Sequence, residues 1–288
     1  MLCSELTARP SRRSSFRAKR VSLPMPSITS RRHPLVLTCR EARGGGDDQP
    51  LLLDGWHLLV EAQAAGITVD AIALGVDPPG AAERRVVETL GDAGSQVVTV
   101  SADVLQAMSP VRTSSGVVAL ARRPEGGITK VFDAMPALIV VAVDVQDPGN
   151  LGALVRAAEA AGATGLIAAG TSADPLGWKA LRASMGSAFR LPLARVEAVA
   201  DVVQSARLLE VRIVAFVPRG GTPLARVDLR APACLFLGGE GPGLTPTLMD
   251  AADVQASIPM APAVESLNVA VAGALALYAA AEQRGAFR

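Results

Sequence analysis

The chain has 288 residues, of which 50% are hydrophobic, 19% charged and 3% aromatic. This length is typical of two domains, and the hydrophobic fraction provides for packed cores. The longest apolar run, residues 267–281, is shorter than the roughly 20 residues that span a bilayer, so no membrane span is expected. The three cysteines (Cys3, Cys39 and Cys234) lack CxxC spacing, which predicts neither a disulfide framework nor a zinc site and favours a reducing compartment, the cytoplasm.

Histidine content and charge limit the function further. Both histidines lie within the first sixty residues, so triad hydrolases and most zinc enzymes are excluded and no metal site is predicted. The net charge is +1, but residues 1–32 hold eight basic side chains and one acidic side chain, which leaves the remainder at −6. A nucleic-acid partner would therefore be met by local arginine patches or by the N-terminal segment.

Residues 1–32 are rich in Ser, Arg and Pro, and they are predicted to form a disordered basic tail. Three interpretations remain open: a start codon assigned too early, with Met25 as the true start, an arm that touches RNA, or a transit peptide. The absence of an apolar signal-peptide core argues against secretion.

Residues 33–123 alternate between short strand and helix patterns, which predicts a small α/β/α domain. The expected elements, in chain order, are a strand at 51–53, a helix at 56–65, a strand at 70–74, a helix at 81–90, a strand at 96–100, a helix at 102–108 and a strand at 117–121. Pro and Gly residues in the segment 124–136 predict a linker to a second domain, 137–288.

The second domain begins with an uninterrupted apolar strand, 137–143, of the kind that is buried in a parallel sheet. The elements expected after it are a helix at 150–161, a strand at 165–168, helices at 179–185 and 198–209, strands at 212–217 and 233–237, and a long helix from Ser266. This alternation predicts an α/β fold with an open, mostly parallel sheet, whose ligands bind beyond the carboxyl ends of the strands.

Three loops at predicted strand ends, 144–156, 237–244 and 258–270, are candidates for a functional site. None contains a Walker sequence or a dinucleotide-binding GxGxxG turn. A glycine-rich loop taken alone is explained equally well as a tight turn and as a ligand-binding loop. The order and spacing of the three together are far more specific.

Together the three loops resemble the three motifs of the SpoU/TrmH family of RNA 2′-O-ribose methyltransferases, in the SPOUT superfamily. Asn150 and Arg156 match the first motif, the Gly-x-Glu-x-x-Gly of 238–243 matches the second, and the Ile-Pro-Met of 258–260 followed by Ser-Leu-Asn at 266–268 matches the third. Residues 33–123 are similar to the ribosomal-protein-like substrate-binding domain that often precedes the methyltransferase domain.

The resemblance implies a deep trefoil knot in the second domain, S-adenosylmethionine held bent in that knot, RNA as substrate and a homodimer. The C-terminal helix is apolar nearly all round, which suits a surface shared between two copies. One departure is Pro262, where relatives usually carry Gly, and its fixed φ and missing N–H bear on the cofactor loop. By position, the residues expected to contact the cofactor are Gly238, Gly239, Ile258, Met260 and Leu267.

The resemblance makes Arg156 the central catalytic residue. Because arginine is a poor base, we favour a role in neutralising charge on the ribose hydroxyl over proton transfer assisted by an RNA phosphate. Glu240 is expected to bind loop amides or to steer Arg156. Asn150 is expected to begin a helix, and with Ser266 it joins the catalytic set; Asn268, expected inside the first turn of the last helix, would orient the catalytic loops.

The sequence thus predicts an S-adenosylmethionine-dependent RNA ribose 2′-O-methyltransferase. Ribosomal RNA is favoured, because the accessory domain accompanies such members more often. The alternatives are an enzyme for transfer RNA, an antibiotic-resistance enzyme for ribosomal RNA, and a non-catalytic RNA-binding assembly factor. Arg112, Arg122 and Arg123 are candidates for phosphate contact, or they are ordinary surface arginines.

Overall fold

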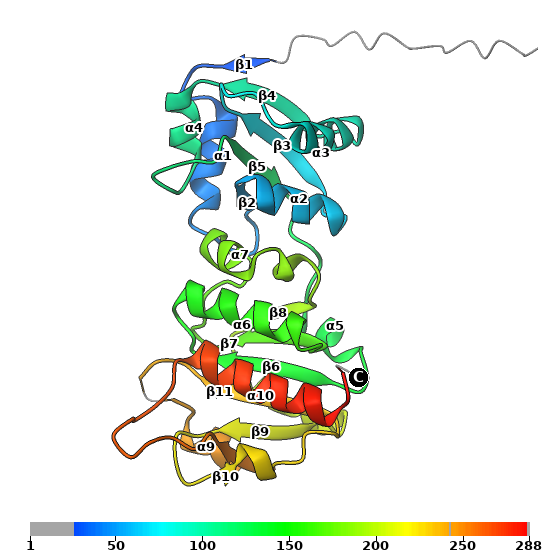
Figure 1. Cartoon of the computed structure of the whole chain (residues 1–288), viewed down its shortest axis with the longest axis vertical. Coiled ribbons are helices and arrows are strands. Elements are labelled where there is room, and N and C mark those ends of the chain that lie inside the picture. Colours follow the sequence, from blue (N-terminus) through cyan, green and yellow to red (C-terminus); the bar gives the residue numbers. More distant parts are fainter. Residues whose placement is uncertain (1–25, 242, 287–288) are drawn as a thin grey trace, which may run out of the picture.

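The computed structural model describes residues 26–241 and 243–286, and it contains two sheets stacked along the long axis of the molecule (Figure 1). The predicted tail lies outside the described residues as far as residue 25. The elements of the first sheet and its helices are β1 (Ser27–Ile28), α1 (Pro34–Ala42), β2 (Leu51–Asp54), α2 (Trp56–Ala64), β3 (Val69–Leu74), α3 (Ala81–Asp92), β4 (Gln96–Val100), α4 (Ala102–Met108) and β5 (Val117–Ala121).

The first sheet is mixed, with the strand order β1-β4-β3-β5-β2. Strands β1, β4 and β3 run parallel, whereas β5 is antiparallel to both of its neighbours. Side chains alternate between its two faces, so that Leu51 and Leu53 face α2 and α3 while Leu52 faces α1 and α4. The predicted strands and helices of this region are confirmed.

Two predicted boundaries are wrong. The predicted disordered tail extends to residue 32, yet Ser27–Ile28 pair with β4 and Ile28 is buried. The segment 124–136 is more than a linker, because it contains α5 (Ile128–Phe132), whose Val131 and Phe132 are buried in the second core. A two-residue strand and a five-residue helix are too short to produce a recognisable period in the sequence.

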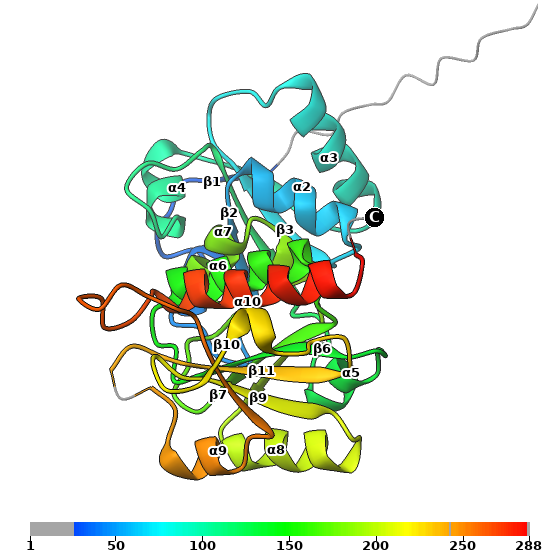
Figure 2. The same ribbon diagram turned by 60° about the horizontal axis from the view of Figure 1, so that its bottom comes forward.

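The elements that follow α5 are β6 (Leu138–Val143), α6 (Pro148–Ala160), β7 (Gly165–Ala169), α7 (Trp178–Ser184), η1 (Ser187–Phe189), β8 (Leu193–Val196), α8 (Val199–Leu208), β9 (Arg212–Phe216), β10 (Thr222–Pro223), η2 (Leu224–Arg226), β11 (Ala233–Gly238), α9 (Pro246–Asp250), β12 (Val254–Ser257) and α10 (Val269–Gln283). The second sheet has seven strands, all parallel, in the order β10-β12-β9-β11-β6-β7-β8. Helices α6, α7 and α10 cover one face, and α5, α8 and α9 cover the other (Figure 2). The predicted α/β fold with a mostly parallel sheet is confirmed, while the trefoil knot stays a prediction.

Ion pairs join the two halves of the chain. Arg190, which follows η1, pairs with Glu61 on α2 and with Glu159 on α6. Arg123, just after β5 of the first sheet, forms a largely buried pair with Asp174, in the loop between β7 and α7. Together with the contact between α7 and β2, these pairs fix the first sheet against the α6–α7 face of the second.

Among the described residues, no helix is long and apolar enough to cross a membrane. Cys39 and Cys234 are both buried, and burial raises the pKa of each thiol to about 12. Both are therefore protonated and unreactive at neutral pH. Cys3 lies outside the described residues.

The Arg123–Asp174 pair predicts a pH-dependent contribution to stability. Burial acts to raise the pKa of Asp174, but the hydrogen bond and charge of Arg123 outweigh it, so the folded-state pKa lies below the ordinary 3.8. The pair therefore stabilises the fold above the unfolded-state pKa, and that stabilisation is lost as the pH falls through the folded-state value. Asp174→Asn leaves Arg123 unpaired and should lower the free energy of unfolding by about 3 kcal/mol at pH 7 in urea titrations.

The difference between wild type and Asp174→Asn should shrink below about pH 4. Asp70→Asn is the matched control, because Asp70 pairs with Arg122 on the exposed surface, where such pairs contribute about 0–1 kcal/mol. Equal effects of the two substitutions at pH 7 would contradict the assignment.

Candidate active site

Four neighbouring strands bring the motif loops together. In the order β12-β9-β11-β6 all strands are parallel, so their carboxyl ends lie at one edge of the sheet. Gly238 at the end of β11 pairs with Val143 at the end of β6. The loops that follow β6, β11 and β12 are the three that carry the sequence motifs, and they meet where an open parallel sheet binds its ligands.

A chain of side-chain hydrogen bonds connects the three motifs. Asn150 Nδ2 donates to Glu240 Oε1 at 2.5 Å, and Asn268 Nδ2 donates to Asn150 Oδ1 at 2.9 Å. Asn268 Oδ1 in turn accepts from the backbone N–H groups of Ala270 and Val271. Since a carboxylate only accepts, Glu240 sets the orientation of the first amide and, through it, that of the second.

Two details of the predicted helix ends are wrong. Asp147, not Asn150, caps α6, since its side chain accepts from the Asn150 N–H at 2.7 Å. The Asn150 side chain is thereby left to bridge the other two motifs. The last helix begins at Val269, so Asn268 is its N-cap and lies outside the first turn, and Ser266 lies in the preceding loop. An Asn at a helix start satisfies orphan N–H groups, which accounts for this placement.

Arg156 lies on the exposed side of α6, two turns into the helix. Among the described residues, its side chain forms neither an ion pair nor a hydrogen bond. Glu159, three residues further along α6, pairs with Arg190, and that hydrogen bond lowers the pKa of Glu159. The structure thus joins Glu240, Asn150 and Asn268 directly, whereas Arg156 stands apart from them with its guanidinium exposed.

A pocket of about 500 Å³ lies beside this hydrogen-bonded chain. It is mostly apolar with a few polar groups, as sites for small organic ligands are. All five residues predicted to contact a cofactor line it, as do Glu240 and Ser266. Gly243 of the second motif lines it as well. The pocket residues that lie outside the three predicted loops are Phe216, Val217, Pro218, Arg219, Met249, Gln255 and Ala272.

Close backbone packing shapes the wall of this pocket. A Cβ on Gly239 would lie 1.9 Å from the Asp144 carbonyl oxygen, and one on Gly238 would lie 2.6 Å from the Gly243 carbonyl carbon. Gly239 N–H also donates to Val143 O at 2.7 Å. The two glycines therefore let neighbouring backbone segments pack directly against each other, an arrangement called here the glycine cradle, beside a pocket whose size and lining fit a nucleoside with an amino-acid tail.

The three arginines proposed for RNA differ in position. Arg112 is exposed at the rim of a second pocket of about 370 Å³, beside the ends of β3 and β5. Arg122 is exposed and pairs with Asp70. Arg123 is only 15% exposed in its pair with Asp174 and donates to Gln49 O, so its prediction as a phosphate contact is wrong. A buried carboxylate partner was not visible in the sequence.

Comparison with known proteins places these features in a family. The model of the SpoU rRNA Methylase family matches residues 137–278. The chain is 30% identical over 228 residues to the 23S rRNA (guanosine(2553)-2'-O)-methyltransferase RlmP of Bacillus subtilis, covering 79% of this chain and 86% of that protein. It therefore belongs to the SpoU methylase family of RNA methyltransferases.

Solved structures agree with this assignment. The AdoMet-bound rRNA methyltransferase of Sinorhizobium meliloti matches with a TM-score of 0.81 at 27% identity, covering 90% of this chain and 98% of that one. The SpoU methyltransferase AviRb of Streptomyces viridochromogenes, in complex with AdoMet, gives a TM-score of 0.77 at 26% identity over 87% and 98% of the two chains. The predictions of family, fold class and methyltransferase activity are confirmed, and S-adenosylmethionine as cofactor agrees with both complexes.

Two Gly→Ala substitutions, one in the glycine cradle and one on α3, should have opposite effects on stability. Gly239→Ala forces backbone apart and should lower the free energy of unfolding by about 2 kcal/mol or more, with loss of cofactor binding. Gly91 lies on α3, and Gly91→Ala places the new methyl group 3.5 Å from Val97 Cγ2, an ordinary contact. This substitution should raise the free energy of unfolding by up to ~1 kcal/mol. Urea titration and calorimetric binding of S-adenosylmethionine measure both effects. A neutral Gly239→Ala variant would show that the backbone approach is not required.

Proposed function

We propose that this chain transfers a methyl group from S-adenosylmethionine to a ribose 2′-hydroxyl of ribosomal RNA, with release of S-adenosylhomocysteine and of the hydroxyl proton to water. The observation that carries the proposal is the hydrogen-bonded chain Glu240–Asn150–Asn268, which joins the three motif loops at the edge of the apolar pocket. Membership of the SpoU family supports the reaction, and relatives named as 23S rRNA 2'-O-methyltransferases support the substrate. A cytoplasmic location belongs to the same proposal.

The pocket residues divide the task of holding the cofactor. Backbone groups of Gly238 and Gly239 would hold it, and Ile258, Met260 and Leu267 would enclose its apolar surface. When bound, S-adenosylmethionine supplies a methyl group activated by its sulfonium. Excluding water with apolar side chains strengthens every charge interaction in the site.

The polar residues act on the RNA. Arg156 neutralises the negative charge that develops on the ribose oxygen and orients the hydroxyl, since a guanidinium donates hydrogen bonds well and accepts a proton poorly. Asn150, held by Glu240 and Asn268, positions the reacting groups, and Ser266 contributes a hydroxyl to the pocket edge. Arg112, exposed in the loop between α4 and β5, and Arg122, exposed directly after β5, contact phosphates remote from the reaction.

Arg156→Ala tests the central assignment. The methylation rate in single-turnover assays should fall about 10²–10³-fold, the usual effect of removing one donor from an oxyanion, while calorimetric affinity for S-adenosylmethionine stays unchanged. Arg226→Ala is the matched control, because Arg226 is an exposed arginine on η2 of the same domain. This variant should retain full activity. Full activity of Arg156→Ala, or an equal loss of cofactor binding, would contradict the role.

The RNA target is tested separately, by mapping 2′-O-methyl groups in RNA from cells with and without the protein. Loss of a site in ribosomal RNA supports the proposal, and loss of a site in transfer RNA replaces it with the other substrate. Unchanged methylation in both RNAs, with an inactive purified protein, indicates the non-catalytic assembly factor.

A homodimer is part of the proposal. Val271, Leu275 and Tyr278 form a stripe on α10 that is between 46% and 49% exposed. Their spacing of four and three residues places them on one side of the helix. Helix α10 packs beside α6, which carries exposed Arg156. We infer that two copies pack through this stripe and that Arg156 of one reaches the cofactor pocket of the other.

Leu275→Glu should abolish such a dimer, because it places charges in an apolar contact. Light scattering at micromolar concentration should give twice the chain mass of 29.6 kDa for the wild type and the single-chain mass for the variant. Leu208→Glu is the control, since Leu208 is 75% exposed on α8, across the sheet from α10. A monomeric wild type would reject the dimer.

A further inference from the structure

Arg219 joins two loops of the cofactor pocket. It follows β9, and its Nη2 donates to the carbonyl oxygens of Pro262 at 2.9 Å and Val264 at 2.7 Å. Both carbonyls belong to the segment 258–268, which carries the third motif between β12 and α10. Arg219 itself lines the pocket together with residues of that segment.

A turn presents the two carbonyls to the guanidinium. Val264 N–H donates to Ala261 O at 3.0 Å, which closes a four-residue turn with Pro262 in its second position. Proline is favoured there because its φ is preset, and the N–H it lacks is not the one that closes the turn. The departure from the family pattern at Pro262 is therefore compatible with an ordered cofactor loop.

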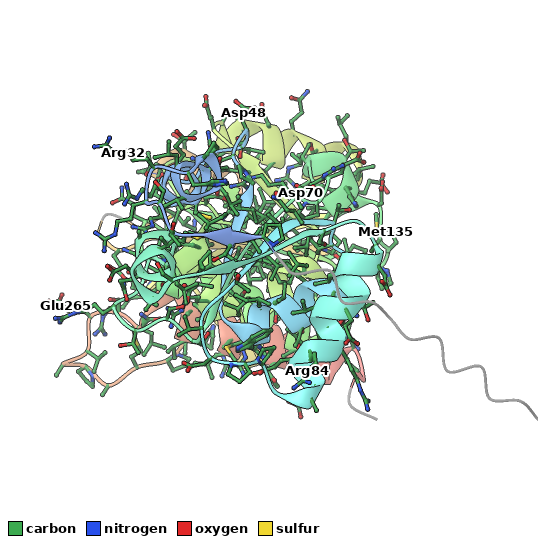
Figure 3. The ribbon with its side chains drawn as sticks, turned by 90° about the horizontal axis from the view of Figure 1, so that it is seen from above. Arg32, Asp48, Asp70, Arg84, Met135 and Glu265 are labelled. Carbon is green, nitrogen blue, oxygen red and sulfur yellow. The ribbon has the colours of Figure 1, made fainter. Side chains whose placement is uncertain are left out.

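The turn has little else to hold it in place. Every residue from 261 to 266 is exposed, so apolar packing does not fix its position. Figure 3 shows Glu265 at the outer edge of the molecule, on a loop that projects from the body. The ends of the segment are fixed independently, by Ser257 Oγ donating to Gly221 O at 2.9 Å and by Asn268 on α10.

We propose that Arg219 is a positioning residue that holds the turn 261–264 and thereby keeps Met260, Ser266 and Leu267 facing the pocket. Charge-assisted hydrogen bonds to two carbonyls suit this role, because one planar guanidinium reaches both without rearrangement. Arg219 acts through the loop and touches no reacting atom. The effect of Arg219 on cofactor affinity rests on the proposed function, whereas its role in holding the loop does not.

Cleavage by a glutamate-specific protease tests the hold on the loop in the full chain without cofactor. The cut after Glu265, followed by mass spectrometry, should be at least fivefold faster in Arg219→Met than in wild type, and Arg219→Lys should fall between them. Arg226→Met, the matched control, should be cut at the wild-type rate. The cut after Glu159, on α6, reports global unfolding and should not change. Equal rates at Glu265 in wild type and Arg219→Met would overturn the proposal.

Calorimetry tests the consequence for the cofactor. Removing two charge-assisted hydrogen bonds should raise the Kd for S-adenosylmethionine about tenfold in Arg219→Met, while kcat at saturating cofactor stays within about twofold. An unchanged Kd in a variant whose loop is cut faster would overturn the link between loop position and affinity. Absence of cofactor binding by wild type would reject the proposed function, and the Glu265 rates would still decide whether Arg219 holds the loop.

Discussion

The carboxamide of Asn150 is the interaction on which the rest of the site depends. It has one end that donates and one that accepts, and it uses both, toward Glu240 and Asn268. These three residues lie far apart in the chain, on the loops after β6, β11 and β12. One amide thus aligns the start of α6, the glycine-rich loop and the start of α10, and the pocket between them takes its shape from that alignment.

Helix α6 carries this alignment to the rest of the molecule. Its first turn holds Asn150, its middle exposes Arg156, and near its end Glu159 pairs with Arg190, which also binds Glu61 of the first sheet. The helix packs on one side against α7 and on the other against α10. The first sheet is therefore connected to Asn150 and Arg156 through a single helix.

Much of this architecture could be predicted from the sequence. Strands such as 96–100 and 117–121 were predicted with their observed bounds, because alternation and apolar runs are local signals. The three motif loops identified the pocket because their order and spacing resemble the motifs of the SpoU/TrmH family. Short elements such as β1, α5 and β12 were not predicted, because two to five residues do not establish a hydrophobic period.

Contacts between distant segments could not be predicted. Nothing in the sequence states that β9 lies between β11 and β12, so Arg219 could not be assigned to the pocket. Likewise Arg123 appeared to be a surface cation until Asp174 was found beside it. Both cases depend on strand order and domain docking, which are properties of the assembled core.

The strand order also determines when the second domain can be completed during synthesis. Central strand β6 pairs with β7, which follows soon after it, but its other partner is β11, with Leu138 opposite Ala233 about 95 residues later. Until β11 emerges from the ribosome, one edge of β6 remains an unpaired row of apolar residues. Such edges are sites of aggregation, and parallel pairing at long range is slow. A nascent chain of this protein therefore keeps one edge of β6 unpaired throughout the synthesis of residues 144–232.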